Sequence, residues 1–370
     1  MAAPIGTALL GTGIFAKDVW KKNLESKSKT GEVEVLAVWS RTPEAAQAYV
    51  AEHFPKAKGV GGDEGLQQIL DDPAVQLVVV VLPVQASLPV VERCLAAGKA
   101  VVQEKPVAGT VEQAQAVIRA YRTKLLPAAP SPQAAPLWMF AENYRYEAVF
   151  VAACRRVKEV GRVIKIDLIC DLPMDERNRY FSSAWRRDTA LCPGGFFMDS
   201  SVHFIAGLRM LANAAGCGEA VTVAAVATQA KPELSFPDSV VGVATLESGA
   251  PASISISLAA HQVRWSLSVV GVDGTLEVLR GGWGGTRSEY TLGVVSKATQ
   301  GEEVVRYGFS GCPDEFEDFL GSTRERAAGS PAPGPEARSS PEQGFGDLAL
   351  VEALLASHAA GGQPVRVVQV

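Results

Sequence analysis

The sequence has few of the residues that build disulfide and metal sites. Its 370 residues include six cysteines, none of them in a Cys-x-x-Cys pair, and four histidines that are widely separated. This pattern favours neither a disulfide framework nor a structural zinc site. We therefore expect reduced thiols, no bound metal and a cytoplasmic location.

Long apolar runs and a strong net charge are also lacking. The longest apolar run, Leu77–Leu82, is closed by Pro83 and is far too short to span a bilayer. The first residues contain no basic segment followed by an apolar one, so we expect no secretory signal. A net charge of −5 gives no reason to expect nucleic acid or a membrane as a partner. The length suggests two or three domains.

A glycine-rich turn follows the first predicted strand. Residues 7–10 form an apolar run that leads into the pattern G-x-G-x-x-A at Gly11, Gly13 and Ala16, and a helix is predicted to follow. Gly11 allows a tight turn, Gly13 lets the backbone approach a pyrophosphate, and Ala16 lets the helix pack close to the strand. The start of that helix would offer free N–H groups to the phosphates. The candidate cofactor-binding residues here are Gly11, Gly13, Ile14, Phe15 and Ala16.

The end of the second predicted strand bears on the choice of dinucleotide. Residues 33–39 form this strand, and Ser40-Arg41 follows it. Proteins that prefer NAD usually place an acidic residue here, whereas a hydroxyl and an arginine suit a 2′-phosphate. A solvated loop arginine is the alternative interpretation. We therefore expect Ser40 and Arg41 to bind NADP(H), with NAD(H) as the alternative cofactor.

Strands and helices then alternate, which predicts a parallel sheet. Further strands are expected over 59–62, 77–82, 100–103 and 137–142, and helices over 43–53, 64–70, 89–97 and 111–121. In such sheets ligands bind beyond the carboxyl ends of the strands. Two loops leave at this edge, and they add four candidate cofactor residues: Leu82, Pro83, Glu104 and Lys105. Lys105 is expected beside the nicotinamide, although a surface Glu-Lys pair is the simpler interpretation.

The second half of the chain has a different pattern. Strands are predicted over 163–172, 221–229, 239–246, 252–258, 264–270 and 274–279, most of them joined by turns. This indicates an α+β domain with a mostly antiparallel, open sheet, whose uncovered face could support self-association. The predicted domains are a Rossmann domain over 1–143 and an α+β domain over 144–370. A helix at about 346–358 could pack back on the first domain, and residues 327–341 are predicted to be a flexible loop.

A second group of polar residues lies between the first two of these strands. Asp199 and His203 are four residues apart, so they share one face if a helix begins near Asp199. A histidine has the right intrinsic pKa for proton transfer near neutrality, and Asp199 could orient it. The preceding Gly194-Gly195 would let the backbone approach a ligand. A half-buried helix histidine with no catalytic role is the alternative.

Taken together, these motifs resemble the Gfo/Idh/MocA family, which includes glucose–fructose oxidoreductase, inositol 2-dehydrogenase and dihydrodiol dehydrogenase relatives. The resemblance rests on the glycine pattern, Glu104-Lys105-Pro106, Trp185-Arg186, Gly194-Gly195 with Asp199 and His203, and the C-terminal helix. It implies an NAD(P)-dependent oxidoreductase that acts on a secondary alcohol or carbonyl of a sugar, polyol or diol. It further implies that Lys105 polarises the substrate hydroxyl, with Asp199 and His203 completing the catalytic site, and that members form dimers or tetramers.

Several features remain open at this stage. Arg186 joins the candidate cofactor residues, and Arg145, Arg186 and Tyr180 are each placed where they could contact the substrate. Ser201 stands where many members have glycine, and Ala206 where many have an acidic residue, which changes the expected pocket floor. A non-catalytic NAD(P)-sensing regulator of the same fold is the main alternative, and a bifunctional enzyme with permanently bound cofactor ranks lower.

Overall fold

The chain forms two units, and each unit combines two separate stretches of the sequence. The computed structural model describes residues 3–281, 288–299, 301–330 and 337–370. The first unit contains Met1–Ala141 and Cys312–Gln343, and the second contains Glu142–Gly311 and Gly344–Val370. The sequence placed the boundary at 143/144 and assigned all later residues to the second domain. The return of 312–343 to the first unit was not predicted.

The first unit is built on a parallel sheet of six strands. The strands are β1 (Ile5–Leu10), β2 (Val33–Ser40), β3 (Lys58–Gly61), β4 (Leu77–Val80), β5 (Ala100–Glu104) and β6 (Leu137–Ala141). Their spatial order is β3-β2-β1-β4-β5-β6, and every pair is parallel. The strand β4 is buried at every position, as expected for a central strand covered on both faces. The predicted Rossmann sheet is confirmed.

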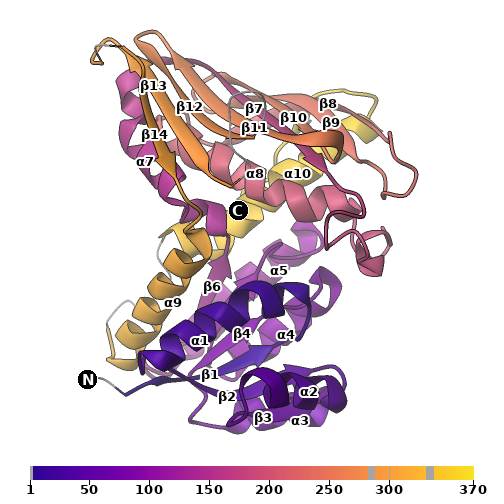
Figure 1. Cartoon of the computed structure of the whole chain (residues 1–370), viewed down its shortest axis with the longest axis vertical. Coiled ribbons are helices and arrows are strands. Elements are labelled where there is room, and N and C mark those ends of the chain that lie inside the picture. The colour runs from indigo at the N-terminus through magenta and orange to yellow at the C-terminus, as the bar shows by residue number, and fades with distance from the viewer. Residues whose placement is uncertain (1–2, 282–287, 300, 331–336) are drawn as a thin grey trace. The chain divides into compact units, whose positions relative to one another are not determined.

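Helices cover this sheet (Figure 1). They are η1 (Ala16–Trp20), α1 (Lys21–Lys29), α2 (Pro43–His53), α3 (Gly62–Asp71), α4 (Val84–Ala96), α5 (Val111–Ala120), η2 (Tyr121–Leu125), α6 (Leu126–Ala128), α9 (Gly311–Ala327) and η6 (Ala337–Ser339). The sequence predicted that the fourth of the main helices would begin at about Pro89. It begins instead at Val84 and carries Pro89 in its interior, where the missing N–H forgoes one backbone hydrogen bond.

The helix α9 completes the core of the first unit. Its residues Phe316, Phe319 and Leu320 are fully buried in the same cluster as Trp20 and Leu24. The rings of Trp20 and Phe316 meet edge to face at 5.4 Å, and Figure 1 shows α9 alongside α1. The sequence suggested that the last helix could pack back on this domain. In the structure α9 has that position, because its i, i+3, i+4 apolar stripe fills the space beside α1.

The second unit is built on a mixed sheet of nine strands. They are β7 (Val163–Pro173), β8 (Ala220–Thr228), β9 (Ser239–Leu246), β10 (Pro251–Ser257), β11 (Ala259–Gly271), β12 (Gly274–Gly281), β13 (Tyr290–Ser296), β14 (Glu303–Tyr307) and β15 (Val365–Arg366). The order is β14-β13-β12-β11-β7-β10-β9-β8-β15, antiparallel except for the parallel pair of β7 and β10. The predicted α+β class is confirmed. The strands β13 and β14 were not predicted.

One face of the large sheet carries the helices of the second unit. These are η3 (Asn143–Arg145), α7 (Ala148–Arg156), η4 (Val157–Val160), η5 (Ala184–Arg186), α8 (Gly195–Ala214) and α10 (Pro341–Ala359). Figure 1 shows α7, α8 and α10 on the same face, and no helix of the described residues covers the other. On that other face Val226, Val241 and Val243 are each more than half exposed. The alternation of buried and exposed residues along β9 reflects this one-sided burial.

Two further sequence expectations concern a predicted loop and the absence of a membrane-spanning helix. The predicted flexible loop over 327–341 includes residues 331–336, which lie outside the described residues. Of the described residues in this range, 327 ends α9, 337–339 form η6 and 341 begins α10. Within the described part of the chain, no helix combines the length and the apolar character needed to cross a membrane.

Candidate active site

The first glycine of the fingerprint is required by the backbone. Gly11 directly follows β1 and has φ of +122°, in the region that favours glycine. A Cβ atom on Gly11 would lie 2.2 Å from the carbonyl oxygen of Val81, which follows β4. The Gly11 N–H donates to the Trp39 carbonyl at 2.8 Å. The turn is therefore fixed between the two neighbouring strands, and no other residue fits it.

The second glycine faces open space instead. A Cβ atom on Gly13 would meet nothing within 4 Å. Helical hydrogen bonding begins at once, since the Lys17 N–H donates to the Gly13 carbonyl at 3.1 Å. Ala16 is fully buried, and Ile14 is about one-third exposed (36%). The first N–H groups of a helix have no partner within the helix. A helix start of this kind, beside a glycine with open space around its Cα, fits a dinucleotide pyrophosphate.

The neighbouring strand ends carry the other predicted cofactor residues. Ser40 closes β2 and is half-buried, and the Arg41 side chain after it is exposed. Leu82 and Pro83 follow β4, and the Leu82 side chain lies close to Gly11. All four belong to the same carboxyl edge of the sheet as the glycine turn. The first unit thus brings its predicted cofactor residues together along one edge.

The loop that carries Lys105 is held by its neighbours. The Trp20 indole donates to Glu104 Oε1 at 2.7 Å, which ties the end of β5 to η1. The Gln103 side-chain amide donates to the Val107 carbonyl at 2.9 Å and so closes the turn around Lys105. Its oxygen accepts from the Trp138 indole at 3.0 Å. The Lys105–Pro106 peptide bond is cis, and Lys105 is partly exposed. Gln103 escaped the sequence analysis, because its side chain acts only through this turn.

In the second unit, the diglycine starts the long helix α8. Gly194 has φ of +76° and Gly195 has φ of +52°. A Cβ on Gly195 would lie 1.8 Å from Ser235 Oγ and 2.7 Å from the Arg186 carbonyl oxygen. The sequence analysis attributed these glycines to the close approach of a ligand. The close neighbours of Gly195 are other parts of the protein itself.

Asp199 is paired with an arginine. Both Asp199 and His203 lie on α8, as predicted, and Asp199 is buried. Asp199 Oδ2 accepts from Arg186 Nε at 2.8 Å. The Arg186 guanidinium also lies over the rings of Trp185 at 4.2 Å and Tyr180 at 5.1 Å. The structure therefore brings two predicted site residues, Arg186 and Asp199, into one ion pair, and the guanidinium of this pair packs on two aromatic rings.

His203 has a different carboxylate partner from the one expected. Its Nδ1 lies 2.7 Å from Glu142 Oε1. The Tyr144 N–H donates to the same oxygen at 3.1 Å, and the Tyr144 ring stacks on the imidazole at 5.3 Å. Glu142 is 1% exposed, whereas the His203 side chain is 22% exposed. The orienting contact that we expected from Asp199 is made by Glu142, which the sequence analysis placed only at the end of a strand.

The electrostatics favour an ionised Glu142. Burial by itself would raise the pKa of this carboxyl, but the neighbouring His203, the Tyr144 N–H and Arg145 outweigh burial and hold the pKa below its usual range. The sequence offered one signal for Glu142: a carboxylate directly after a strand that is apolar throughout. Its 61-residue separation from His203 gave no reason to connect the two.

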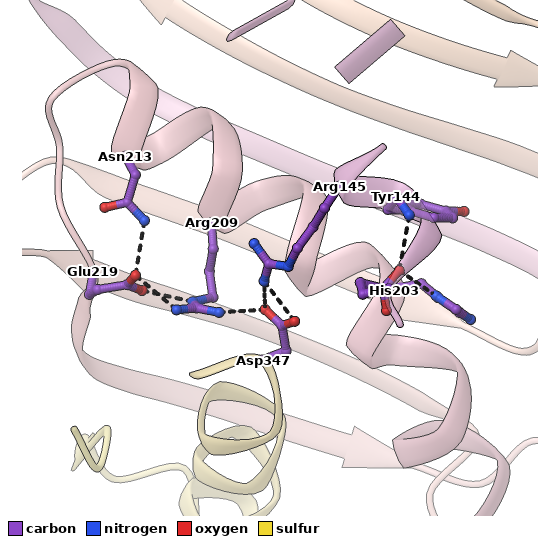
Figure 2. Close-up of polar contacts among 8 residues, drawn as sticks. Tyr144, Arg145, His203, Arg209, Asn213, Glu219 and Asp347 are labelled. Carbon is purple, nitrogen blue, oxygen red and sulfur yellow. Dashed lines mark hydrogen bonds and ion pairs between the residues drawn. The ribbon is translucent and has the colours of Figure 1, made fainter. Parts of the chain in front are cut away.

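A buried charge network anchors the same segment. Arg145, which the sequence left as a possible substrate contact, is 2% exposed and donates to both oxygens of Asp347 at 2.5 and 2.7 Å. Asp347 on α10 is fully buried and also accepts from Arg209 of α8 (Figure 2). Arg209 is in turn paired with Glu219 at 2.8 Å. The guanidinium of Arg145 is therefore held in the protein interior by Asp347.

The predicted catalytic residues thus fall into two sets. Lys105 belongs to the first unit, and Asp199 and His203 belong to the second. Each set is held by its own hydrogen bonds. Among the described residues, no group of histidine, cysteine, aspartate and glutamate side chains could hold a metal ion.

Comparisons with known proteins find family profiles that match a part of each unit. The sequence profile described as "Oxidoreductase family, NAD-binding Rossmann fold" matches residues 5–127, and the profile of the "GFO/IDH/MocA C-terminal domain" matches residues 151–277. The chain is 28% identical to dehydrogenase FPY6 of Fusarium mangiferae over 97% of each protein. It is 29% identical to an uncharacterized protein of Saccharomyces cerevisiae over 60% of this chain and 59% of that protein.

Solved structures show the same fold over nearly the whole chain. An oxidoreductase from Thermotoga maritima has a TM-score of 0.78 at 26% identity, with 98% of each chain covered. Levoglucosan dehydrogenase, solved in complex with NADH and levoglucosan, also has a TM-score of 0.78, at 19% identity, with 99% of this chain and 100% of that chain covered. Two family profiles that match both units in order, together with a glycine turn that fits a dinucleotide, show that the chain belongs to the Gfo/Idh/MocA family of NAD-binding oxidoreductases.

Proposed function

We propose that the protein transfers a hydride between a nicotinamide cofactor and a secondary alcohol, or the matching carbonyl, of a sugar, polyol or diol. The family supports a dehydrogenase that acts on a CH–OH group. The observation that carries the proposal is the position of Lys105, a partly exposed lysine on a rigid turn at the edge of the sheet where the glycine turn also lies. A cation there could stabilise negative charge on a substrate oxygen beside the cofactor.

NADP(H) is the cofactor that we favour. The end of β2 offers the Ser40 hydroxyl and the exposed Arg41 guanidinium, a pair suited to a 2′-phosphate. The residues that would hold the rest of the dinucleotide are Gly11, Gly13, Leu82 and Pro83, with Ile14, Phe15 and Ala16 at the helix start, and with Glu104, Lys105 and Arg186. NAD(H) is the alternative, and an equal affinity for both would favour a cofactor site that does not use Arg41.

Three side chains would carry the chemistry. When bound, the nicotinamide supplies the hydride acceptor or donor. Lys105 would hold the substrate hydroxyl and stabilise the oxyanion that forms as its proton leaves. His203 would accept that proton in oxidation and return it in reduction. Asp199, already neutralised by Arg186, would accept a hydrogen bond from a substrate hydroxyl.

The open sheet face is the proposed site of self-association. Val226 pairs with Val241 across β8 and β9, and both are more than half exposed together with Val243. Adjacent exposed valines on a flat sheet are an apolar patch that a second copy could cover. A homodimer or homotetramer is expected, and sedimentation of the purified protein as a monomer would contradict this part of the proposal.

The first test is binding and turnover in the purified protein. Fluorescence titration with NADPH and NADH gives the two affinities, and a screen of sugars, inositols, trans-diols and dicarbonyls is followed by the absorbance of the reduced nicotinamide. We expect NADPH to bind more tightly and at least one compound to turn over. Binding without turnover across the screen would favour the NAD(P)-sensing regulator, and failure to bind either nucleotide would contradict the cofactor assignment.

The Lys105→Met variant tests the lysine itself. Loss of the cation should lower kcat by at least about a hundredfold, since one oxyanion-stabilising group contributes about that much. The affinity for NADPH should change little. Lys124→Met, which removes an exposed lysine elsewhere in the same unit, is the matched control. Near-native turnover by Lys105→Met would show that this lysine is not catalytic.

A further inference from the structure

The pairing of Glu142 with His203 has a chemical consequence for the imidazole. Glu142 Oε1 accepts two N–H groups, from His203 Nδ1 and the Tyr144 backbone. Its other oxygen, Oε2, is buried and has no hydrogen-bond partner among the described residues. An ionised carboxylate can only accept hydrogen bonds, so His203 Nδ1 must carry a hydrogen. A neutral His203 therefore has its lone pair on Nε2.

We propose that Glu142 is a positioning residue that fixes His203 in the Nδ1–H tautomer and makes Nε2 the atom that transfers the proton. The inference rests on the proposed function, in which His203 is the acid and base. Glu142 does not itself touch the substrate. It acts through the imidazole, in the way that a carboxylate orients the histidine of hydrolytic triads and of metal sites.

The proton balance follows from this tautomer. In oxidation the substrate hydroxyl gives its proton to Nε2, and the imidazole becomes an imidazolium. The positive charge that forms lies against the Glu142 carboxylate, 2.7 Å from Nδ1. In reduction the same proton returns from Nε2 to the substrate oxygen. Without Glu142, a neutral imidazole could place its hydrogen on Nε2, and that nitrogen could then no longer accept a proton.

The segment around Glu142 is built rigidly enough for this role. The Tyr144 ring stacks on the imidazole with 24° between the ring planes and so limits ring rotation. Arg145 is locked to Asp347, and Glu147 Oε2 accepts the Ser310 N–H at 2.9 Å. Three contacts to separate parts of the second unit therefore hold residues 142–147 in place, and Figure 2 shows that of Arg145 with Asp347.

The charged neighbours of the pair are few. Arg145 lies on the same segment, and Asp199 lies one turn before His203 on α8, paired with Arg186. Burial raises the pKa of the Tyr144 hydroxyl far above its usual range, so this group stays neutral through the working pH range. The Glu142 carboxylate is therefore the nearest negative charge with a hydrogen bond to the imidazole.

Nitrogen NMR of the imidazole tests the tautomer without any substrate. The four histidines can be labelled, and the His203 signals assigned by their absence in His203→Asn. In the wild-type protein Nδ1 should be protonated and Nε2 should have the chemical shift of an unprotonated nitrogen. Glu142→Ala should mix the two tautomers, whereas Glu142→Gln keeps an oxygen acceptor and should preserve the wild-type tautomer. Glu176→Gln, the same chemical change at an exposed glutamate of the second unit, is the control.

Kinetics and pH dependence separate positioning from a merely structural role. Glu142→Gln removes the negative charge that favours the imidazolium, so the acidic limb of the kcat/KM profile for oxidation should move to lower pH, by about one unit. Glu142→Ala should lower kcat at least about tenfold with little change in KM. Thermal unfolding of each variant checks that it is folded, and Glu142→Gln keeps the test available if the alanine variant is not.

The outcomes distinguish this inference from the proposed function. An Nε2–H tautomer in the wild-type protein, or an unchanged tautomer in a folded Glu142→Ala, would overturn the positioning role. The same pH shift in Glu176→Gln would also overturn it. Full activity of His203→Asn, with the tautomer as expected, would instead contradict the proposed function of His203 and with it the catalytic purpose of the pair.

Discussion

The two units hold their functional residues by different means. In the first, the glycine turn and the Lys105 loop are short stretches of chain that depend mainly on their own backbone and on adjacent strands, and the Trp20 indole adds one contact to Glu104 from 84 residues away. In the second, the contacts join distant positions, with 61 residues between Glu142 and His203 and 202 between Arg145 and Asp347. The first unit therefore has features that motifs can specify, and the second has features that only packing can assemble.

The largest effect is expected in the second unit, from Asp347→Asn. This change removes the charge that neutralises two buried guanidinium groups, those of Arg145 and Arg209. Breaking a buried ion pair by removing one partner costs about 3–5 kcal/mol, and denaturant unfolding should show a loss of this size. The control is Glu342→Gln, which breaks the more exposed pair with Arg122 and should cost about 1 kcal/mol or less. Equal losses would mean that the network does not hold the second unit together.

A smaller effect is expected in the first unit, from Gly11→Ala. The new Cβ would meet the Val81 carbonyl oxygen at 2.2 Å, and the positive φ would be strained. Backbone strain of this kind costs about 1–3 kcal/mol. Thermal unfolding should show a lower Tm, and NADPH affinity should fall with it because the turn must shift. A fully stable variant would show that the turn can relax, and that its form is less constrained than the contact implies.

The smallest effect on stability is expected from Gly13→Ala. Nothing lies within 4 Å of the added atom, so the free energy of unfolding should change by no more than about 0.5 kcal/mol. Binding should respond instead, because the methyl group would occupy space that a pyrophosphate needs. The measurement is the NADPH titration beside that of Gly11→Ala. Normal affinity in Gly13→Ala would contradict the fit of the dinucleotide to this turn.

Particular elements show where the sequence was a good guide to the structure and where it was only a partial one. The strand β9 was predicted at its observed bounds, 239–246, because alternation of buried and exposed residues is written into the sequence. The strands β13 and β14 were missed, and so was the membership of α9 in the first unit. A helix with an apolar stripe must pack on something, but its sequence does not say on which unit.

The candidate site divides in the same way. Gly11, Lys105, Asp199 and His203 were recognised because each belongs to a motif with fixed spacing. Glu142 was not, and the carboxylate expected to orient His203 was assigned to Asp199, the nearest acid in the sequence. In the structure Arg186 pairs with Asp199, and Glu142 is hydrogen-bonded to the His203 imidazole.

The sequence by itself determined the two fold classes, the dinucleotide turn and the identity of the residues available for chemistry. These depend on backbone conformation and on hydrophobic periodicity, which neighbouring residues largely set. The tertiary structure alone decided which carboxylate meets which cation, which residues anchor the 142–147 segment and which helix completes the first core. The physical reason is that hydrogen bonds and ion pairs between side chains depend on ångström-scale proximity, and proximity between distant positions exists only once the chain has packed.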